Sequence, residues 1–183
     1  MPARVDSLRL RRYGGFAMPS RRAALSLVLL FLSFALGSAA QSAQPDIYPP
    51  LEQASADIAA ALKSAATSHK RVILDFGGNW CTDCHVLDLY FHDAVNRPIL
   101  EANYILVHIN IGHMDANVDL TARYQVPLSR GVPGMAVLDE HGKLLYSQKA
   151  GEFEAMRDMH SSAVTDFLVR WKPKSGASTA LTR

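Results

Sequence analysis

The sequence has only two cysteines, no apolar run of membrane-spanning length and, beyond residue 22, no excess of basic charge. Its uncharged apolar segment, residues 23–36, is 14 residues long, whereas a comfortable membrane-spanning helix needs about 20. Nucleic-acid binding requires a basic face, which the chain lacks outside its first residues. These absences argue against a nucleic-acid-binding protein and against a stable membrane span.

The start of the chain has the pattern of an export signal. Arg21 and Arg22 come before the apolar segment, and small residues follow it as far as Ala40. This order of charge, apolar core and small residues is typical of a secretory signal peptide. We therefore expect a leader over residues 1–40, with the signal from Met18 to Ala40, and an exported, periplasmic protein. An uncleaved membrane anchor is the alternative.

Removal of the leader changes the charge of the chain. It takes away six arginines and Asp6, so the formal net charge falls from +2 to −3. The remaining 143 residues are enough for one domain with its own hydrophobic core. We expect a linker at residues 41–50, the domain at 51–172 and a disordered tail at 173–183.

Within the domain, helical and strand patterns alternate. The first two strands are joined by a long helical connection and are expected to be parallel, while the last two are close enough for an antiparallel hairpin. The predicted helices are 51–68, 81–95, 98–102, 118–124 and 154–171, and the predicted strands are 71–77, 104–111, 135–138 and 144–149. This alternation predicts an α/β domain.

Both cysteines lie where the first predicted strand turns into a helix. Cys81 is expected near the first helical turn, and Cys84 follows one turn later. Unpaired backbone N–H groups and the positive end of the helix dipole favour an anion there, so a thiol forms its thiolate more easily. An exported protein is also in a compartment where disulfides form and persist.

Four sequence features follow one another along residues 72–171. An acid in a predicted strand precedes the first cysteine by six residues, and a Trp-Cys-x-x-Cys motif opens the next predicted helix. A Gly-Val-Pro motif then precedes a predicted strand, and a hairpin and final helix follow. The residues concerned are Asp75, Trp80, Cys81, Cys84, Gly131, Val132 and Pro133. In these features the chain resembles the thioredoxin superfamily, specifically its exported members. The resemblance implies a three-layer α/β fold with a central mixed sheet of about four strands flanked by helices.

The resemblance also implies a reaction. Cys81 would attack a substrate disulfide, and Cys84 would resolve the resulting mixed disulfide. Asp75 would exchange a proton with Cys84, because burial favours its neutral acid form. Trp80 and the Val132-Pro133 pair, with Pro133 cis in the family, would bind the substrate peptide. The predicted function is therefore an exported thiol-disulfide oxidoreductase that reduces or isomerises protein disulfides.

The same resemblance defines the expected partners. They are protein thiols and disulfides and a membrane electron donor, and the protein would act as a monomer. No metal is expected, and no cofactor beyond the redox-active disulfide of Cys81 and Cys84. Between these cysteines the family's usual Gly-Pro is replaced by Thr82-Asp83. The Asp83 carboxylate would disfavour a thiolate beside it, which favours a reductase or isomerase over a strong oxidase, with protonated His85 as a possible counterweight.

Two other classes of function fit parts of the sequence. Cys81, Cys84 and His85 match the Cys-x-x-Cys-His motif that attaches c-type haem. Against haem, that motif needs neither an acid in a preceding strand nor a Gly-Val-Pro strand entry. A non-catalytic thioredoxin-fold binding module is the third class, and the intact cysteine pair disfavours it.

Overall fold

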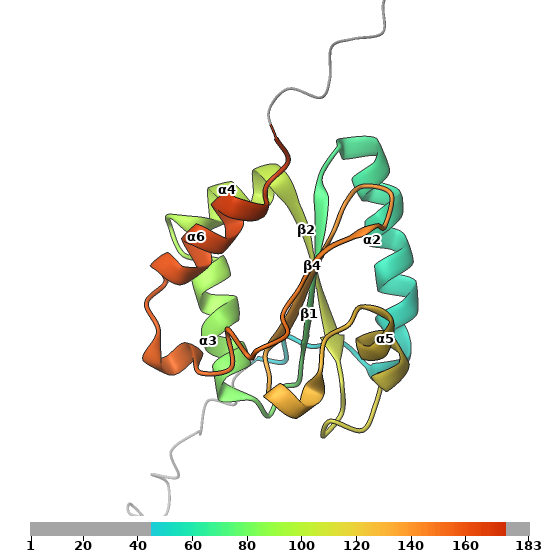
Figure 1. Cartoon of the computed structure of the whole chain (residues 1–183), viewed down its shortest axis with the longest axis vertical. Helices are drawn as coiled ribbons and strands as arrows, with labels where there is room; N and C mark the ends of the chain where they lie inside the picture. Colours follow the sequence, from blue (N-terminus) through green and yellow to red (C-terminus); the bar gives the residue numbers. More distant parts are fainter. Residues whose placement is uncertain (1–44, 175–183) are drawn as a thin grey trace, which may run out of the picture. The chain divides into compact units, whose positions relative to one another are not determined.

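A four-stranded mixed sheet forms the centre of the domain in the computed structural model, which describes residues 45–174 (Figure 1). The strand order is β2-β1-β3-β4. β1 pairs with β2 in parallel and with β3 antiparallel, and β3 and β4 form the expected hairpin. The strands are β1 Arg71–Gly77, β2 Tyr104–Asn110, β3 Gly134–Leu138 and β4 Leu144–Ser147. The predicted leader, residues 1–40, lies outside the described residues, as does most of the predicted tail.

Helices cover both faces of this sheet (Figure 1). One apolar core lies between the sheet and α2 with α5, and the other lies between the sheet and α3, α4 and α6. The helices are α2 Ala54–Ser68, α3 Thr82–Phe91, α4 Asn96–Asn103, α5 Val118–Arg123 and α6 Ser162–Trp171, with short 3₁₀ turns η1 Leu51–Gln53, η2 Leu128–Arg130 and η3 Met156–Asp158. The predicted three-layer α/β fold is confirmed. Within residues 45–174, no helix combines the length and the apolar character that crossing a membrane would require.

The sequence pattern explains why β1 is central. Residues 72–77 are all buried, which matches a continuous apolar run covered on both faces. A different local pattern explains α2: its buried residues recur at helical spacing along one face, and they are Ala54, Ile58, Ala61 and Ala65. These two elements require only local patterns, so both were predictable.

Two predicted helices are shorter in the structure. The helix predicted to reach residue 95 ends at Phe91, because the Asp93 carboxylate accepts hydrogen bonds from the N–H groups of Val95 and Asn96 and so starts α4. The final helix begins at Ser162 and not at residue 154. Before it, the chain makes turns and η3, where Met156 is buried in the core.

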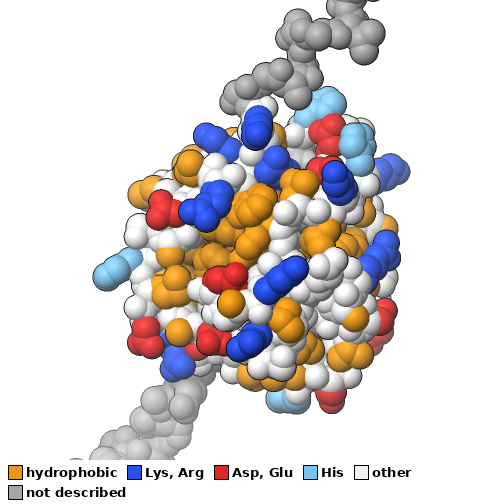
Figure 2. Space-filling model, viewed as in Figure 1, with side chains coloured by type: hydrophobic (Ala, Val, Ile, Leu, Met, Phe, Trp, Pro, Cys, Tyr) orange, Lys and Arg blue, Asp and Glu red, His pale blue; other side chains and the backbone are white. Residues whose placement is uncertain are grey.

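Aromatic side chains fill the space between α6 and β4. Figure 2 shows hydrophobic side chains gathered in a hollow on this face, and the residues lining it include Tyr146, Phe153, Phe167 and Trp171. Tyr146 lies edge-on to Phe167 at 5.5 Å between ring centroids, and Phe153 packs edge-on against Phe167 at 5.3 Å. These aromatic contacts belong to the core between the sheet and α3, α4 and α6.

The predicted linker needs a correction at its described end. Residues 45–50 form no helix or strand, but Tyr48 is buried and belongs to the core on the α2 side. Asn79 fixes this segment, because its Oδ1 accepts hydrogen bonds from the N–H groups of Ile47 and Tyr48, each at 2.9 Å. Residues 45–50 are therefore part of the domain and not of a linker.

Candidate active site

The two cysteines lie at the start of α3 and form a disulfide, with their Cα atoms 5.3 Å apart. Cys81 is the N-cap residue of the helix, and its Sγ accepts a hydrogen bond from the N–H of Cys84 at 3.1 Å. Cys81 is 5% exposed and Cys84 is fully buried. An incoming group can therefore reach the sulfur of Cys81 more easily than that of Cys84.

The predicted substrate-binding residues lie beside Cys81. The Val132–Pro133 peptide bond is cis, and the Val132 carbonyl oxygen is 3.8 Å from Cys81 Sγ. The Pro133 carbonyl accepts a hydrogen bond from the buried Gln148 side chain at 3.0 Å. The backbone at Val132 is thus fixed against the disulfide.

Trp80 lies on the surface next to Cys81, with 46% of its area exposed. Its indole Nε1 donates a hydrogen bond to the Gly112 carbonyl at 2.6 Å, and its ring stacks on His113 at 5.7 Å between centroids. The loop that follows β2 therefore anchors this exposed ring.

Asp75 is fully buried on β1 and contacts two side chains that the sequence analysis did not anticipate. Its Oδ2 accepts hydrogen bonds from the Tyr48 hydroxyl at 2.7 Å and from His108 Nδ1 at 2.9 Å, whereas its Oδ1 has no hydrogen-bond partner. His108 lies directly opposite Asp75 in the parallel pair of β1 and β2. A lone histidine in the apolar strand 104–111 was the signal that could have revealed it.

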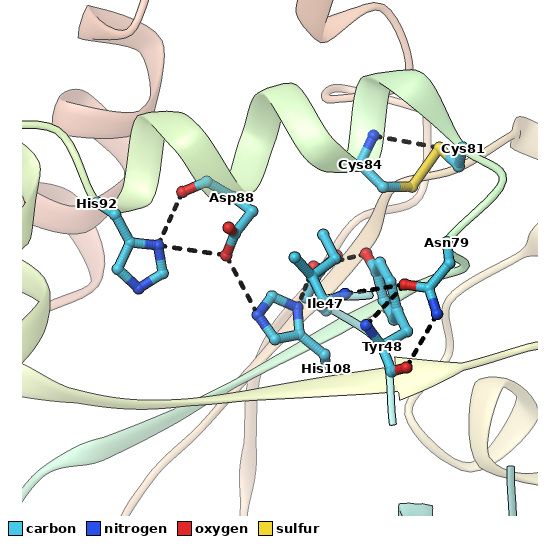
Figure 3. A network of polar contacts seen from close by, with 9 residues as sticks. Ile47, Tyr48, Asn79, Cys81, Cys84, Asp88, His92 and His108 are labelled. Carbon is cyan, nitrogen blue, oxygen red and sulfur yellow. Dashed lines mark hydrogen bonds and ion pairs between the residues drawn. A yellow bond between two sulfur atoms is a disulfide. The ribbon is translucent and has the colours of Figure 1, made fainter. Parts of the chain in front are cut away.

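His108 also connects Asp75 to α3 (Figure 3). Its Nε2 is 3.3 Å from Asp88 Oδ1, and the same carboxylate is 3.2 Å from His92 Nδ1. Burial acts to lower the pKa of His108, but hydrogen bonds and charges from Asp75 and Asp88 outweigh it and raise the pKa to about 9. For Asp88, burial acts to raise the pKa, but its bond to His108 and the nearby histidine charges lower it overall.

The contacts of His108 with Asp75 and Asp88 predict that the protein is less stable in alkaline solution. The folded state holds the His108 proton more tightly than the unfolded chain, so its contribution is complete below pH 6.5 and is lost as pH rises through about 9. We expect a decrease of about 3 kcal/mol in the free energy of unfolding across this range, measured by urea denaturation. The His108→Asn variant should lack this decrease, and an equal decrease in the variant would contradict the assignment.

Asp83, between the two cysteines, is paired with Arg157. Arg157 Nε lies 3.1 Å and 3.2 Å from the two carboxylate oxygens, and its backbone N–H donates to Asp83 Oδ1 at 2.9 Å. Burial acts to raise the pKa of Asp83, but the hydrogen bonds and charge of Arg157 outweigh it and lower the pKa. The predicted effect of Asp83 on Cys81 is therefore partly offset by a cation from a distant segment. His85, the other expected counterweight, donates its Nε2–H to the Asn79 carbonyl at 2.9 Å.

Removal of the Arg157 charge should make the reduced Cys81 less reactive. In Arg157→Ala the Asp83 carboxylate would disfavour the thiolate more strongly, so we expect alkylation of Cys81 by iodoacetamide at pH 7 to slow about two- to fivefold. Arg97→Ala is a matched control, because Arg97 is 61% exposed against 62% for Arg157 and is paired with Glu101 at 3.3 Å. Equal alkylation rates in the two variants would contradict this role of Arg157.

A cysteine pair at a strand-to-helix turn, a buried acid on the preceding strand and a cis X-Pro bond against the first sulfur define a thioredoxin-like protein. The comparisons agree with this class: a family model described as thioredoxin-like matches residues 53–140. The chain is 31% identical to the disulphide isomerase from Xylella fastidiosa Temecula1, with 70% of this chain and 98% of that chain covered and a TM-score of 0.66. The chain therefore belongs to the thioredoxin superfamily, as the sequence predicted.

Two further similar structures share less sequence with this chain. A DsbH oxidoreductase is 21% identical, with 77% of this chain and 99% of that chain covered and a TM-score of 0.48. A thioredoxin from Thermus thermophilus is 17% identical, with 61% and 81% covered and a TM-score of 0.46. The comparison with curated proteins found no significant match.

Proposed function

We propose that the protein is an exported thiol-disulfide oxidoreductase that reduces or isomerises protein disulfides. The observation that carries this proposal is the Cys81–Cys84 disulfide at the start of α3, in which Cys81 is 5% exposed and Cys84 is fully buried. The 31% identity to a protein described as a disulphide isomerase supports it. The disulfide also engages both sulfur atoms that a thioether-linked haem would need, which disfavours the haem alternative.

In the proposed reaction the reduced protein transfers two electrons to its substrate. The Cys81 thiolate attacks one sulfur of a substrate disulfide and releases the other as a thiolate, forming a mixed disulfide. The Cys84 sulfur, after losing its proton, attacks Cys81 Sγ, which breaks the mixed disulfide and releases the second substrate sulfur. The products are a reduced substrate and the Cys81–Cys84 disulfide. A dithiol partner, which we propose is a membrane protein, then restores the reduced form, so no other cofactor is required.

The substrate would bind beside Cys81 as an extended peptide. In this proposal the Val132 carbonyl, which lies 3.8 Å from Cys81 Sγ, would face the backbone of such a peptide. Pro133 fixes the neighbouring backbone, and the exposed ring of Trp80 offers apolar contact area. We propose that the protein binds substrate in this way as a monomer.

Catalysed reduction of a protein disulfide tests the proposal. With dithiothreitol as reductant, we expect the domain to accelerate the reduction of insulin at least tenfold over dithiothreitol alone. No acceleration would leave the binding module as the better interpretation. Equilibration with glutathione buffers then measures the reduction potential of the Cys81–Cys84 pair, which indicates the direction of electron transfer. A potential between about −180 and −270 mV supports a reductase or isomerase, whereas a potential near −120 mV supports an oxidase.

Export is a separate part of the proposal, supported by the order of charges, apolar residues and small residues before Gln41. Expression of the full chain in a bacterium and mass measurement of the periplasmic product test it. We expect the mass of a chain that begins at Gln41. An uncut chain in the membrane fraction would favour the anchor.

A further inference from the structure

The Tyr48 hydroxyl lies between the buried acid and the buried cysteine. It donates a hydrogen bond to Asp75 Oδ2 at 2.7 Å. A Cβ atom on Gly77 would come closer than 3.0 Å to both the Tyr48 hydroxyl and Cys84 Sγ, so these two groups flank the same small space. Figure 3 shows the hydroxyl end of the Tyr48 ring directed toward Cys84. The absence of a side chain at Gly77 therefore leaves the hydroxyl next to the sulfur.

Tyr48 is held in this position by the residues around the cysteine motif. Asn79, two residues before Cys81, accepts hydrogen bonds from the Ile47 and Tyr48 N–H groups and donates one to the Tyr48 carbonyl at 3.0 Å. Asn110 donates to the Pro49 carbonyl at 2.9 Å. The Tyr48 ring is 3% exposed. Its place relative to the cysteines is thus fixed by the same turn that carries them.

The acid is oriented from its other side. His108 Nδ1 donates to Asp75 Oδ2, and the ring of His108 lies edge-on to Tyr48 at 5.1 Å between centroids. The charged and titratable groups that face His108 are Asp75 on β1, Asp88 and His92 on α3, Tyr48 in the segment 45–50, and Asp57 of α2, which lines a cavity that His108 also lines. Asp75 Oδ1 remains a buried acceptor without a partner. Both hydrogen bonds to the carboxylate therefore converge on Oδ2, the oxygen that the Tyr48 hydroxyl contacts.

We propose that Tyr48 carries the proton between Cys84 and Asp75, with His108 as the residue that positions the carboxylate; this deepens and rests on the proposed oxidoreductase function. When Cys84 becomes nucleophilic, its S–H proton passes to the Tyr48 oxygen while the Tyr48 O–H proton passes to Asp75 Oδ2. The Cys84 thiolate then attacks Cys81 Sγ of the mixed disulfide and releases the substrate thiolate. Tyr48 is unchanged, and Asp75 holds the proton until the protein is reduced again.

The environment of Tyr48 favours its neutral hydroxyl form, which a proton carrier in this position requires. Burial, followed by the charge of Asp75 and the hydrogen bond to it, raises the pKa of Tyr48 well above its usual value. The hydroxyl therefore keeps one proton at all times, and it can accept a second only as it passes the first on. The 2.7 Å hydrogen bond to Asp75 provides the second leg of this concerted transfer, and the space beside Gly77, which Tyr48 and Cys84 both flank, is where the first leg would occur.

Rapid mixing of the reduced protein with an aromatic disulfide such as dithionitrobenzoate separates the two steps. The first coloured thiolate reports attack by Cys81, and the second reports resolution by Cys84. In Tyr48→Phe we expect the second step to slow at least tenfold while the first changes less than twofold. Tyr104→Phe is the matched control, because Tyr104 is also 3% exposed and donates its hydroxyl to the Leu168 carbonyl at 2.6 Å, in the core on the α3 side. Equal second-step rates in the two variants would overturn the proposal.

A pH profile tests the part of His108. His108→Asn keeps a side-chain N–H donor near Asp75 but removes the imidazolium charge that lies 2.9 Å from the proposed proton acceptor. We expect the pH of half-maximal second-step rate to rise by about one unit in this variant. An unchanged profile would overturn the role of His108. If the unmodified protein neither forms nor resolves a mixed disulfide, the proposed function itself fails, whatever the variants do.

Discussion

The Cys81→Ser variant is expected to lose catalysed disulfide reduction by at least about a thousandfold. Cys81 is the less buried of the two cysteines, it caps α3, and the Val132 carbonyl lies 3.8 Å from its sulfur. A serine hydroxyl at the same place does not ionise near neutral pH and cannot form a disulfide. The insulin assay with dithiothreitol measures this loss directly.

Cys84→Ser is the matched control for that experiment. Its Cys81 can still attack a substrate, but no second thiol releases the product, so we expect a lasting one-to-one mixed disulfide visible by mass spectrometry without reductant. Turnover retained in Cys81→Ser would contradict the assignment of Cys81 as nucleophile. A mixed disulfide formed equally by both variants would do so too.

The second large effect is expected on stability. Tyr48→Ala should lower the free energy of unfolding by about 3–5 kcal/mol, the range for removal of a buried aromatic side chain. The variant leaves a cavity in the core on the α2 side and removes a hydrogen bond from the buried Asp75. Urea denaturation of the oxidised protein at pH 7 measures it.

Tyr104→Ala is the matched control for this stability measurement. Tyr104 on β2 is buried to the same extent as Tyr48 and also donates its hydroxyl within the core. We expect losses of similar size in the two variants. A linker residue would instead change stability by less than about 0.5 kcal/mol, and such a result for Tyr48→Ala would contradict its place in the core.

The elements and the cysteine turn could be predicted because their signals are local. An apolar run, two glycines and a Cys-x-x-Cys motif suffice to predict a strand, a turn and a helix in that order. The Gly-Val-Pro motif is equally local, and the fold then brings Val132 against Cys81. Two strand pairs followed from the lengths of the connections: β1 and β2 are parallel, and β3 and β4 form an antiparallel hairpin, as expected. The antiparallel pairing of β1 with β3 was not predicted.

The partners of the buried acid could not be predicted in the same way. Tyr48 precedes Asp75 by 27 residues and His108 follows it by 33, so only the packed fold brings them together. The contact between Arg157 and Asp83 spans 74 residues. Residues 41–50 were predicted as a linker; residues 45–50 form no helix or strand, but no local pattern showed that they pack on the domain.

The exposed ring of Trp80 makes the redox state of the protein visible by fluorescence. Trp80 is adjacent to Cys81 in the chain, and a disulfide quenches the emission of a nearby indole. The other tryptophan, Trp171, lies at the end of α6 against Tyr146. Emission from Trp80 should therefore rise on reduction while that from Trp171 stays constant, which gives an unlabelled optical signal for every redox experiment described above.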